Sequence, residues 1–285
     1  MADQVGTGEH PTVETAWRDA ILILLAHGSS MPSGADMARK HAETLRELGL
    51  FADVRAAFLR DTPHPRDLIE AEDARDIYVV PFMASDGYSI DTLIPEALGL
   101  SGPLTERISE GTRRRIHMCR PVGTHEDLLN WQVGGLCRFI DSLPAKEKPL
   151  SVLVAAHGTD RHAGNFDRTR DVVAVISAAG IAETVDAVFI DQSPSLDTWR
   201  DHVRTDTVLV VPYLMNLGRH GRHDIPEAMG FAGRGASTTL AEGSIAGPYD
   251  VDGNRMYYGP LLGACPSIPQ VTLERVRQWD APWHE

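Results

Sequence analysis

Short runs of Val, Ile, Leu and Ala recur along the chain, and longer stretches with helical spacing of apolar residues separate them. Two such runs open the segments 21–30 (ILILLAHGSS) and 151–160 (SVLVAAHGTD). The stretches 34–48 and 166–180 place apolar residues three or four positions apart, and the second ends in a glycine that suits a helix C-terminus. A strand that is apolar at every position is typical of burial on both faces. The pattern therefore predicts an α/β fold in which helices cover a parallel sheet.

The same series of segments occurs twice in the chain. Three pairs of similar segments keep a separation of 130 or 131 positions, and a fourth, weaker pair follows them in the same order. Several landmarks in one constant order indicate an internal duplication of the fold. The pairs are 21–30 with 151–160, 54–63 with 185–194, 79–100 with 210–231, and 122–129 with 262–269.

Each copy is long enough to form a domain. We expect an N-terminal α/β domain over 18–140 and a similar C-terminal domain over 150–280, joined by the polar segment 141–149 with its two prolines. Parallel sheets of this kind bind ligands beyond the carboxyl ends of their strands. Function should therefore be sought in the residues that directly follow the apolar runs.

Composition and charge narrow the classes of function. Of the 285 residues, 42% are hydrophobic and 24% charged, as in globular proteins, and no apolar stretch is long enough for a membrane span. The start of the sequence lacks the basic and apolar regions of a secretory signal, so the cytoplasm is expected. A formal charge of −13 disfavours nucleic acid and anionic membranes as partners. Three widely spaced cysteines predict neither a disulfide framework nor a zinc knuckle.

Histidines stand where the apolar runs end. His27 and His157 occupy equivalent positions in the two copies, and each is followed by a glycine that allows a sharp turn. His220 follows another buried run in the second copy, where the first copy has Ser89. Neutral imidazoles bind first-row divalent metals and accept protons near pH 7. A single strand-end histidine is more often a packing residue, but the repetition favours a functional pair formed by His157 and His220.

Basic residues accompany the histidines of the second copy. Arg219 and Arg222 alternate with His220 and His223, and they can supply the local positive charge that an anionic ligand needs in an acidic protein. The alternative is that these arginines form a solvated face with neighbouring acids. Asp191 is a further candidate, because it follows the strand of 185–190 in the place of a first-copy arginine.

Together these motifs resemble a known family, the class II tetrapyrrole chelatases of the CbiX and SirB type. The resemblance extends over about 21–275, and the motifs that carry it are LLAHGS, LVAAHG, the AVFI…SP segment and VPYLMNLGRHGRHDIP. It implies two similar α/β domains with a macrocycle cleft between them. It also implies insertion of Co²⁺ or Fe²⁺ into sirohydrochlorin or a related tetrapyrrole, with the metal as substrate and with no cofactor required.

Carried over to this sequence, the resemblance places the site in the C-terminal half. His157 and His220 match the family's metal-binding and proton-accepting histidines, whereas His27 matches only the first of them. Ser89, His27 and the two arginines Arg219 and Arg222 are then expected to bind the anionic substrate. Some relatives also use a glutamate, which has no clear counterpart here; the candidates are Asp86, Asp91 and Asp191.

Two other functions remain open at this point. One is a non-catalytic tetrapyrrole or metal binder, because the first copy lacks the second histidine and the glutamate is missing. The other is a zinc-dependent hydrolase that uses His157, His220, His223 and Asp224, which requires His223 to point into the site. The segment 232–253 is expected to form a flexible lid or an insertion.

Overall fold

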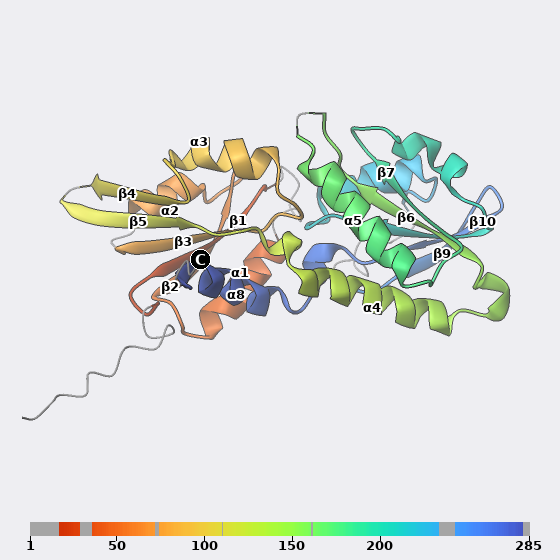
Figure 1. Cartoon of the computed structure of the whole chain (residues 1–285), viewed down its shortest axis with the longest axis horizontal. Helices are drawn as coiled ribbons and strands as arrows, with labels where there is room; N and C mark the ends of the chain where they lie inside the picture. The colour runs from red at the N-terminus through yellow and green to blue at the C-terminus, as the bar shows by residue number, and fades with distance from the viewer. Residues whose placement is uncertain are drawn as a thin grey trace, which may run out of the picture.

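The computed structural model describes residues 17–28, 36–71, 74–109, 111–160, 162–233 and 243–281. Within them the chain forms two five-stranded sheets with strand orders β2-β1-β3-β5-β4 and β7-β6-β8-β10-β9, flanked by helices (Figure 1). The two orders are the same once the second set is renumbered, so the predicted duplicated α/β architecture is confirmed. The first sheet consists of β1 (Ile21–Ala26), β2 (Asp53–Phe58), β3 (Asp76–Pro81), β4 (Leu104–Ser109) and β5 (Thr112–Met118), and the second of β6 (Leu150–Ala156), β7 (Thr184–Phe189), β8 (Thr207–Pro212), β9 (Ala246–Val251) and β10 (Asn254–Tyr258).

The sheets are parallel except at one edge of each. Strand β4 runs antiparallel to β5, and β9 runs antiparallel to β10. Only a short turn joins each of these pairs, and a turn of this length can connect only antiparallel neighbours. This edge was not expected from the apolar runs. It also corrects the expectation for 232–253, because Ala246–Val251 is a strand and the middle of that segment, 234–242, lies outside the described residues.

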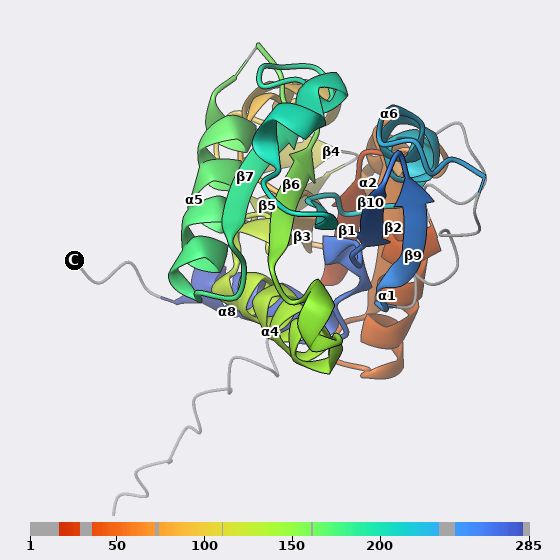
Figure 2. The ribbon, with the colours of Figure 1, turned by 90° about the vertical axis from the view of Figure 1, so that its right-hand side faces the viewer.

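Helices cover both faces of each sheet. They are α1 (Asp36–Glu47), α2 (Pro65–Ala71), α3 (Ile94–Leu98), α4 (Glu126–Ser142), α5 (Gly164–Ala178), α6 (Ile225–Ala228) and α8 (Ile268–Asp280). Figure 2 shows α5 beside β6 and β7, against which it packs.

The central strands are buried on both sides, as their sequence predicts. All residues of β1, β6 and β8 are buried. In β1 successive side chains alternate between two clusters of core residues, with Leu22 and Leu24 in one and Ile21 and Ile23 in the other. Since successive residues of a strand point to opposite faces, both faces of this sheet must be covered by helices.

The last helix of each copy packs against the sheet of the other copy. Helix α8 lies against the first sheet, where Asp280 accepts hydrogen bonds from Tyr78 Oη on β3 at 2.8 Å and from Trp17 Nε1 at 2.6 Å. Helix α4 lies below the second sheet in Figure 1, and the ring of Phe139 meets that of Tyr257 on β10 at a centroid distance of 4.8 Å. The exchange ties the two sheets into one body. The expected domain ranges, 18–140 and 150–280, each contain one complete sheet. They do not separate the helices in the same way, because α4 and α8 each cover the sheet of the other range.

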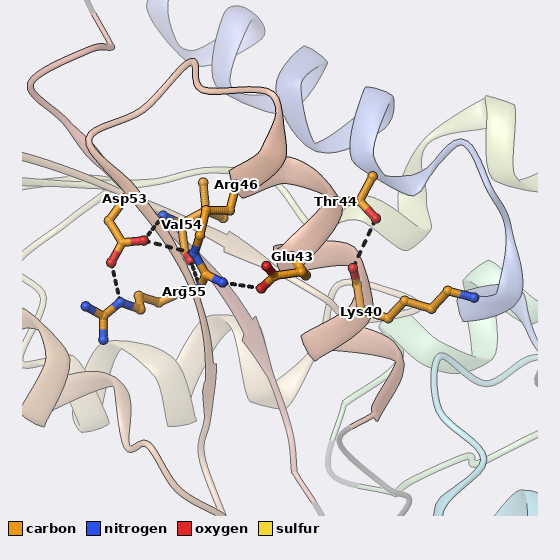
Figure 3. A network of polar contacts seen from close by, with 7 residues as sticks. All are labelled: Lys40, Glu43, Thr44, Arg46, Asp53, Val54 and Arg55. Carbon is orange, nitrogen blue, oxygen red and sulfur yellow. Dashed lines mark hydrogen bonds and ion pairs between the residues drawn. The ribbon is translucent and has the colours of Figure 1, made fainter.

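A polar network joins α1 to the start of β2 on the surface of the first copy (Figure 3). Arg46 Nε donates to Asp53 Oδ1 at 3.1 Å, and Arg46 also contacts Glu43 and the carbonyl of Val54. Partial burial raises the pKa of Asp53, but hydrogen bonds from Arg55 and Arg46 outweigh it and hold the pKa below its ordinary value. Exposed ion pairs of this kind add little stability, so the network mainly sets the position of α1.

The cysteines and the apolar character of the helices were considered in the sequence, and the described residues show both. Cys119, Cys137 and Cys265 are all free, as their spacing predicts. Among the helices of the described chain, none combines the length and apolar character needed to cross a bilayer.

Candidate functional site

A large open cavity lies where the carboxyl ends of the strands of both sheets meet. Its volume is about 1100 Å³, and its walls include residues from both copies. That volume slightly exceeds the range of pockets for ordinary small ligands and suits a large macrocycle. Of the residues singled out in the sequence, the cavity is lined by His27, Ser89, Asp86, His157, Asp191, Arg219 and His220.

The two predicted histidines of the second copy meet in this cavity. The rings of His157 and His220 lie 4.6 Å apart between centroids and are nearly perpendicular, at 88°. Their side chains are 44% and 35% exposed, so a ligand in the cavity can reach both. His157 directly follows β6, and His220 begins a π-helical turn, His220–Asp224, beyond β8. Two neighbouring strands of one sheet, β6 and β8, therefore bring the imidazoles together.

The backbone after β6 accounts for the glycine that follows His157. Gly158 adopts a φ of +72°, and a Cβ there would lie 2.8 Å from the Cβ of Gln192 and 2.9 Å from that of Phe189. Asn165 accepts a hydrogen bond from the N–H of Gly158 at 2.9 Å, and Gln192 accepts one from Thr159 at 3.1 Å. The tight turn and these two amides hold the His157 backbone in place. Neither amide was found by sequence reasoning, because nothing in the local pattern marks them.

Each imidazole has a fixed orientation. His220 Nδ1 lies 2.6 Å from Asp224 Oδ2, and His157 Nδ1 lies 2.6 Å from the carbonyl oxygen of Gly158. Both partners are acceptors, so in the neutral rings Nδ1 carries the proton and Nε2 keeps its lone pair. Asp191 Oδ2 lies 3.6 Å from Nε2 of His157. The contacts at Nδ1, to Asp224 and to the Gly158 carbonyl, are the usual support of a metal-binding histidine, whereas Asp191 lies on the Nε2 side of His157.

Asp224 remains ionised because of the same contacts. Partial burial raises its pKa, but hydrogen bonds from His220 and from Arg219 lower it, and the net shift is below the ordinary value. The Arg219 Nε to Asp224 Oδ1 distance is 3.2 Å, while the arginine side chain is 76% exposed. Arg219 can thus hold Asp224 with one part of its guanidinium and present the rest to solvent at the cavity wall.

The first copy contributes His27 to the same cavity. Burial lowers the pKa of His27, and the charges of Arg60, His157 and His220 lower it further. The ring is therefore neutral at physiological pH. Arg60, which also lines the cavity, was noted in the sequence only as the counterpart of Asp191.

Two sequence candidates lie elsewhere. Among the described residues, Arg222 and His223 do not line the cavity. His223 is 45% exposed on its side chain, and its Nδ1 lies 3.8 Å from Glu227 one turn along the chain. The hydrolase hypothesis needs His223 beside His157 and His220, and this geometry does not provide it. Asp91 is not among the residues that line the cavity, but its Oδ2 is 3.0 Å from Nε2 of His162, which does line it.

Another group of potential metal ligands consists of His125, Asp127 and Glu274. His125 Nδ1 accepts a hydrogen bond from the N–H of Asp127 at 3.3 Å and so caps α4. Its Nε2 lies 3.0 Å from Glu274 on α8. Nδ1 is engaged in capping α4 and Nε2 in joining α4 to α8, so we assign this group a structural role.

Comparison with known proteins identifies the family of the chain. The model of the CbiX family matches residues 21–134 and 151–279, which together make up most of the chain. The chain belongs to the CbiX family. The family model matches once in each copy, as the duplication found in the sequence requires.

Individual relatives are similar over nearly the whole chain. A Halobacterium salinarum protein named "Probable sirohydrochlorin cobaltochelatase" is 30% identical over 278 residues, which cover 92% of each chain. SirB from Bacillus subtilis, solved with Fe³⁺, has a TM-score of 0.61 at 17% identity, with 92% of this chain and 96% of SirB covered. The chelatase-like protein DR2241 of Deinococcus radiodurans has a TM-score of 0.65 at 23% identity. The match covers 93% of this chain and 56% of DR2241, so the chain spans little more than half of that relative.

Proposed function

We propose that the protein inserts a divalent metal, Co²⁺ or Fe²⁺, into sirohydrochlorin or a related tetrapyrrole. The observation that carries this proposal is the pair of perpendicular imidazoles, His157 and His220, exposed in a cavity between two duplicated sheets. The Halobacterium relative, to which the chain is similar over 92% of its length, supports sirohydrochlorin as the substrate. The SirB structures with Fe³⁺ and with cobalt support a metal of this kind.

The residues can perform both tasks that metal insertion requires. A hydrated dication must exchange water for protein ligands, and two pyrrole nitrogens must lose their protons. The Nε2 atoms of His157 and His220 are unprotonated in the neutral rings and point away from their Nδ1 partners, so each can bind the metal or accept a proton. When His220 takes up a proton at Nε2, the imidazolium forms beside the ionised Asp224, which stabilises it.

Asp191 is the acidic group that best fits the second half of the site. Its carboxylate lies 3.6 Å from His157 Nε2, so both atoms can contact one cation. The other two sequence candidates are less suited. Asp91 pairs with His162, and Asp86 lies on the opposite copy. We therefore assign to Asp191 the part played by a glutamate in some relatives.

The substrate requires positive charge in an acidic protein. Sirohydrochlorin carries several carboxylates on its rim, and Arg219, Ser89 and His27 line the cavity at positions where they can bind them. The metal is a substrate in this reaction. Two protons leave the macrocycle as one dication enters it, so the charge balances without a redox partner. We therefore propose that no cofactor is needed. We also propose that the protein acts in the cytoplasm.

An optical assay tests substrate and metal together. The purified chain is mixed with sirohydrochlorin under anaerobic conditions, Co²⁺, Fe²⁺ or Ni²⁺ is added in turn, and the change in the tetrapyrrole absorbance is followed against a protein-free control. A chelatase accelerates the spectral change with at least one metal and turns over many times. A chain that binds the tetrapyrrole and shows no acceleration with any metal is a carrier, and the proposed catalysis is then rejected.

A further inference from the structure

His27 and Arg60 form a second pair of strand-end residues in the cavity, contributed by the first copy. The backbone around them repeats that of the second copy. The N–H of Arg60 donates to the carbonyl of His27 at 3.0 Å, as the N–H of Asp191 donates to the carbonyl of His157 at 2.9 Å. The two turns are thus equivalent in their main chain, and the copies differ in their side chains.

The side-chain differences reverse the charge of this half-site. Asp191 of the second copy is replaced by Arg60, and His220 is replaced by Ser89. A metal site loses both an anionic ligand and an imidazole through these changes, and it gains a fixed cation that repels a dication. The same changes favour an anion, because a guanidinium, an imidazole N–H and a hydroxyl are all donors to carboxylates.

Arg60 is available to such an anion. Its side chain is exposed at the cavity wall. Within the described part of the chain, no carboxylate forms an ion pair with it, and the adjacent Asp61 is directed to Arg39 at 3.6 Å. Arginines elsewhere on the first copy, such as Arg46 and Arg115, are paired with Asp53 and Asp76. The described acidic residues that line the cavity are Asp86, Asp160 and Asp191; none of them forms an ion pair with Arg60, and Asp191 lies beside His157.

We propose that His27 and Arg60 form a carboxylate-binding subsite that receives an acidic side chain of the tetrapyrrole rim. The proposal rests on the proposed function and names how its substrate is held. In a cleft built from two equivalent halves, a disc-shaped ligand can enter in two orientations related by the duplication. A cation from the first copy and two imidazoles from the second remove that equivalence. The subsite therefore sets the orientation in which the macrocycle meets His157 and His220.

Binding of metal-free sirohydrochlorin tests the subsite without catalysis. The dissociation constant is measured by absorbance titration for the unmutated chain, Arg60→Met and Arg60→Lys. A lost charge-assisted contact weakens binding about 10- to 100-fold in Arg60→Met, and Arg60→Lys recovers part of it. KM in the insertion assay should rise by a similar factor while kcat changes less. Arg113→Met is the matched control, because Arg113 is an exposed arginine of the same copy that lies outside the cavity-lining residues and pairs with Glu106.

An uncharged ligand shows whether Arg60→Met weakens binding through the lost positive charge or through a change in the shape of the cavity. The fully esterified macrocycle lacks the carboxylates, so it should bind the unmutated chain and Arg60→Met with the same affinity. Co²⁺ binding without tetrapyrrole should be no weaker in Arg60→Met. Affinities for the free acid within twofold of each other would overturn the subsite, and so would an equal loss for the ester. If no metal is inserted by the unmutated chain but tetrapyrrole binding still depends on Arg60, the subsite stands and the proposed catalysis fails.

Discussion

The two copies of the fold share a backbone and differ in chemistry. After β1 and after β6 the chain places a histidine and a glycine, and both glycines have a φ between 70° and 80°. Beyond that point the second copy supplies His220, Asp224 and Asp191, whereas the first supplies Ser89 and Arg60. The comparison teaches that packing preserved the turns in both copies, while the side chains that face the cavity diverged. The predictions below test how complete this separation is.

The largest effect should come from removing a second-copy imidazole. We expect His157→Ala and His220→Ala each to lower kcat/KM for metal insertion by about 10²- to 10⁴-fold, the range for loss of a catalytic proton acceptor. His27→Ala, the equivalent change in the first copy, should have a smaller effect that appears mainly in KM. The measurement is the steady-state insertion assay with Co²⁺. Equal losses for His157→Ala and His27→Ala would mean that both copies work as catalysts.

His223→Ala provides the control for these variants. It removes an imidazole from the same π-helical turn as His220, but His223 lies outside the cavity-lining residues and faces Glu227. We expect insertion within about threefold of the unmutated chain, since surface changes of this kind cost little. A loss as large as that of His220→Ala would place His223 in the site and revive the hydrolase-like ligand set.

The next prediction concerns the backbone that the copies share. A Cβ on Gly123 would lie 2.4 Å from the carbonyl oxygen of Met83, and one on Gly263 would lie 1.7 Å from that of Met215. Gly123 and Gly263 are equivalent positions of the duplication, whereas Met83 matches Leu214, the residue before Met215. Because main-chain atoms cannot move aside, Gly123→Ala and Gly263→Ala should each lower the free energy of unfolding by about 3 kcal/mol or more. Denaturant titration measures the change.

Gly135→Ala is the matched control for these glycines. Gly135 lies inside α4, and the nearest atom to a new Cβ is the guanidinium of Arg138 at 3.9 Å. Alanine is the better helix former, so this variant should gain about 0.5–1 kcal/mol. If Gly263→Ala is as stable as Gly135→Ala, the close packing of Gly263 against the Met215 carbonyl is contradicted.

The sequence was sufficient for the fold class, for the duplication and for placing His157 and His220 in one cavity. Each of these depends on a local and repeated signal. The residues of β1, β6 and β8 are apolar except for Ser151 and Thr207, and His157 and His220 follow β6 and β8 in the sequence. The family resemblance added the chemistry. The meeting of His157 with His220 then follows from adjacent parallel strands, whose carboxyl ends share one edge of the sheet.

Other features depend on contacts between distant segments. The exchange of α4 and α8 is carried by pairs such as Tyr78 with Asp280, which are 202 positions apart. No periodicity encodes which sheet an amphipathic helix covers. Arg222 was expected beside the substrate because it is near His220 in sequence, but the π-helical turn gives neighbouring residues different directions. The position of Arg60 in the cavity could have been predicted from the sequence, because Arg60 aligns with the site candidate Asp191 in the duplication.

A smaller loss should follow from changing the partner of His220. Asp224→Asn keeps the shape of the residue, but it removes the charge that stabilises an imidazolium and leaves the ring orientation less well defined. We expect kcat/KM to fall about 10- to 100-fold, as for other supporting groups of metal-binding histidines. The lower pKa of the aspartate means that its stabilising contacts are present at neutral pH and are lost as the pH falls through that pKa. The pH profile of kcat should therefore change in the variant, a result that simple unfolding does not give.

The smallest effect concerns a contact between the copies. Buried His41 on α1 lies with Nε2 2.8 Å from the carbonyl of Gly263, so it donates as a neutral ring. Burial lowers its pKa, the charge of Lys40 also lowers it, and the hydrogen bond to Gly263 opposes them. Its contribution to stability is therefore full above the unfolded-state pKa of about 6.5 and declines as the pH falls below it. His41→Gln retains a donor that does not titrate. The fall in Tm between about pH 7.5 and 5.5 should be a few degrees less in this variant than in the unmutated chain. An identical fall in Tm in both proteins would show that protonation of His41 does not weaken the contact between the two copies.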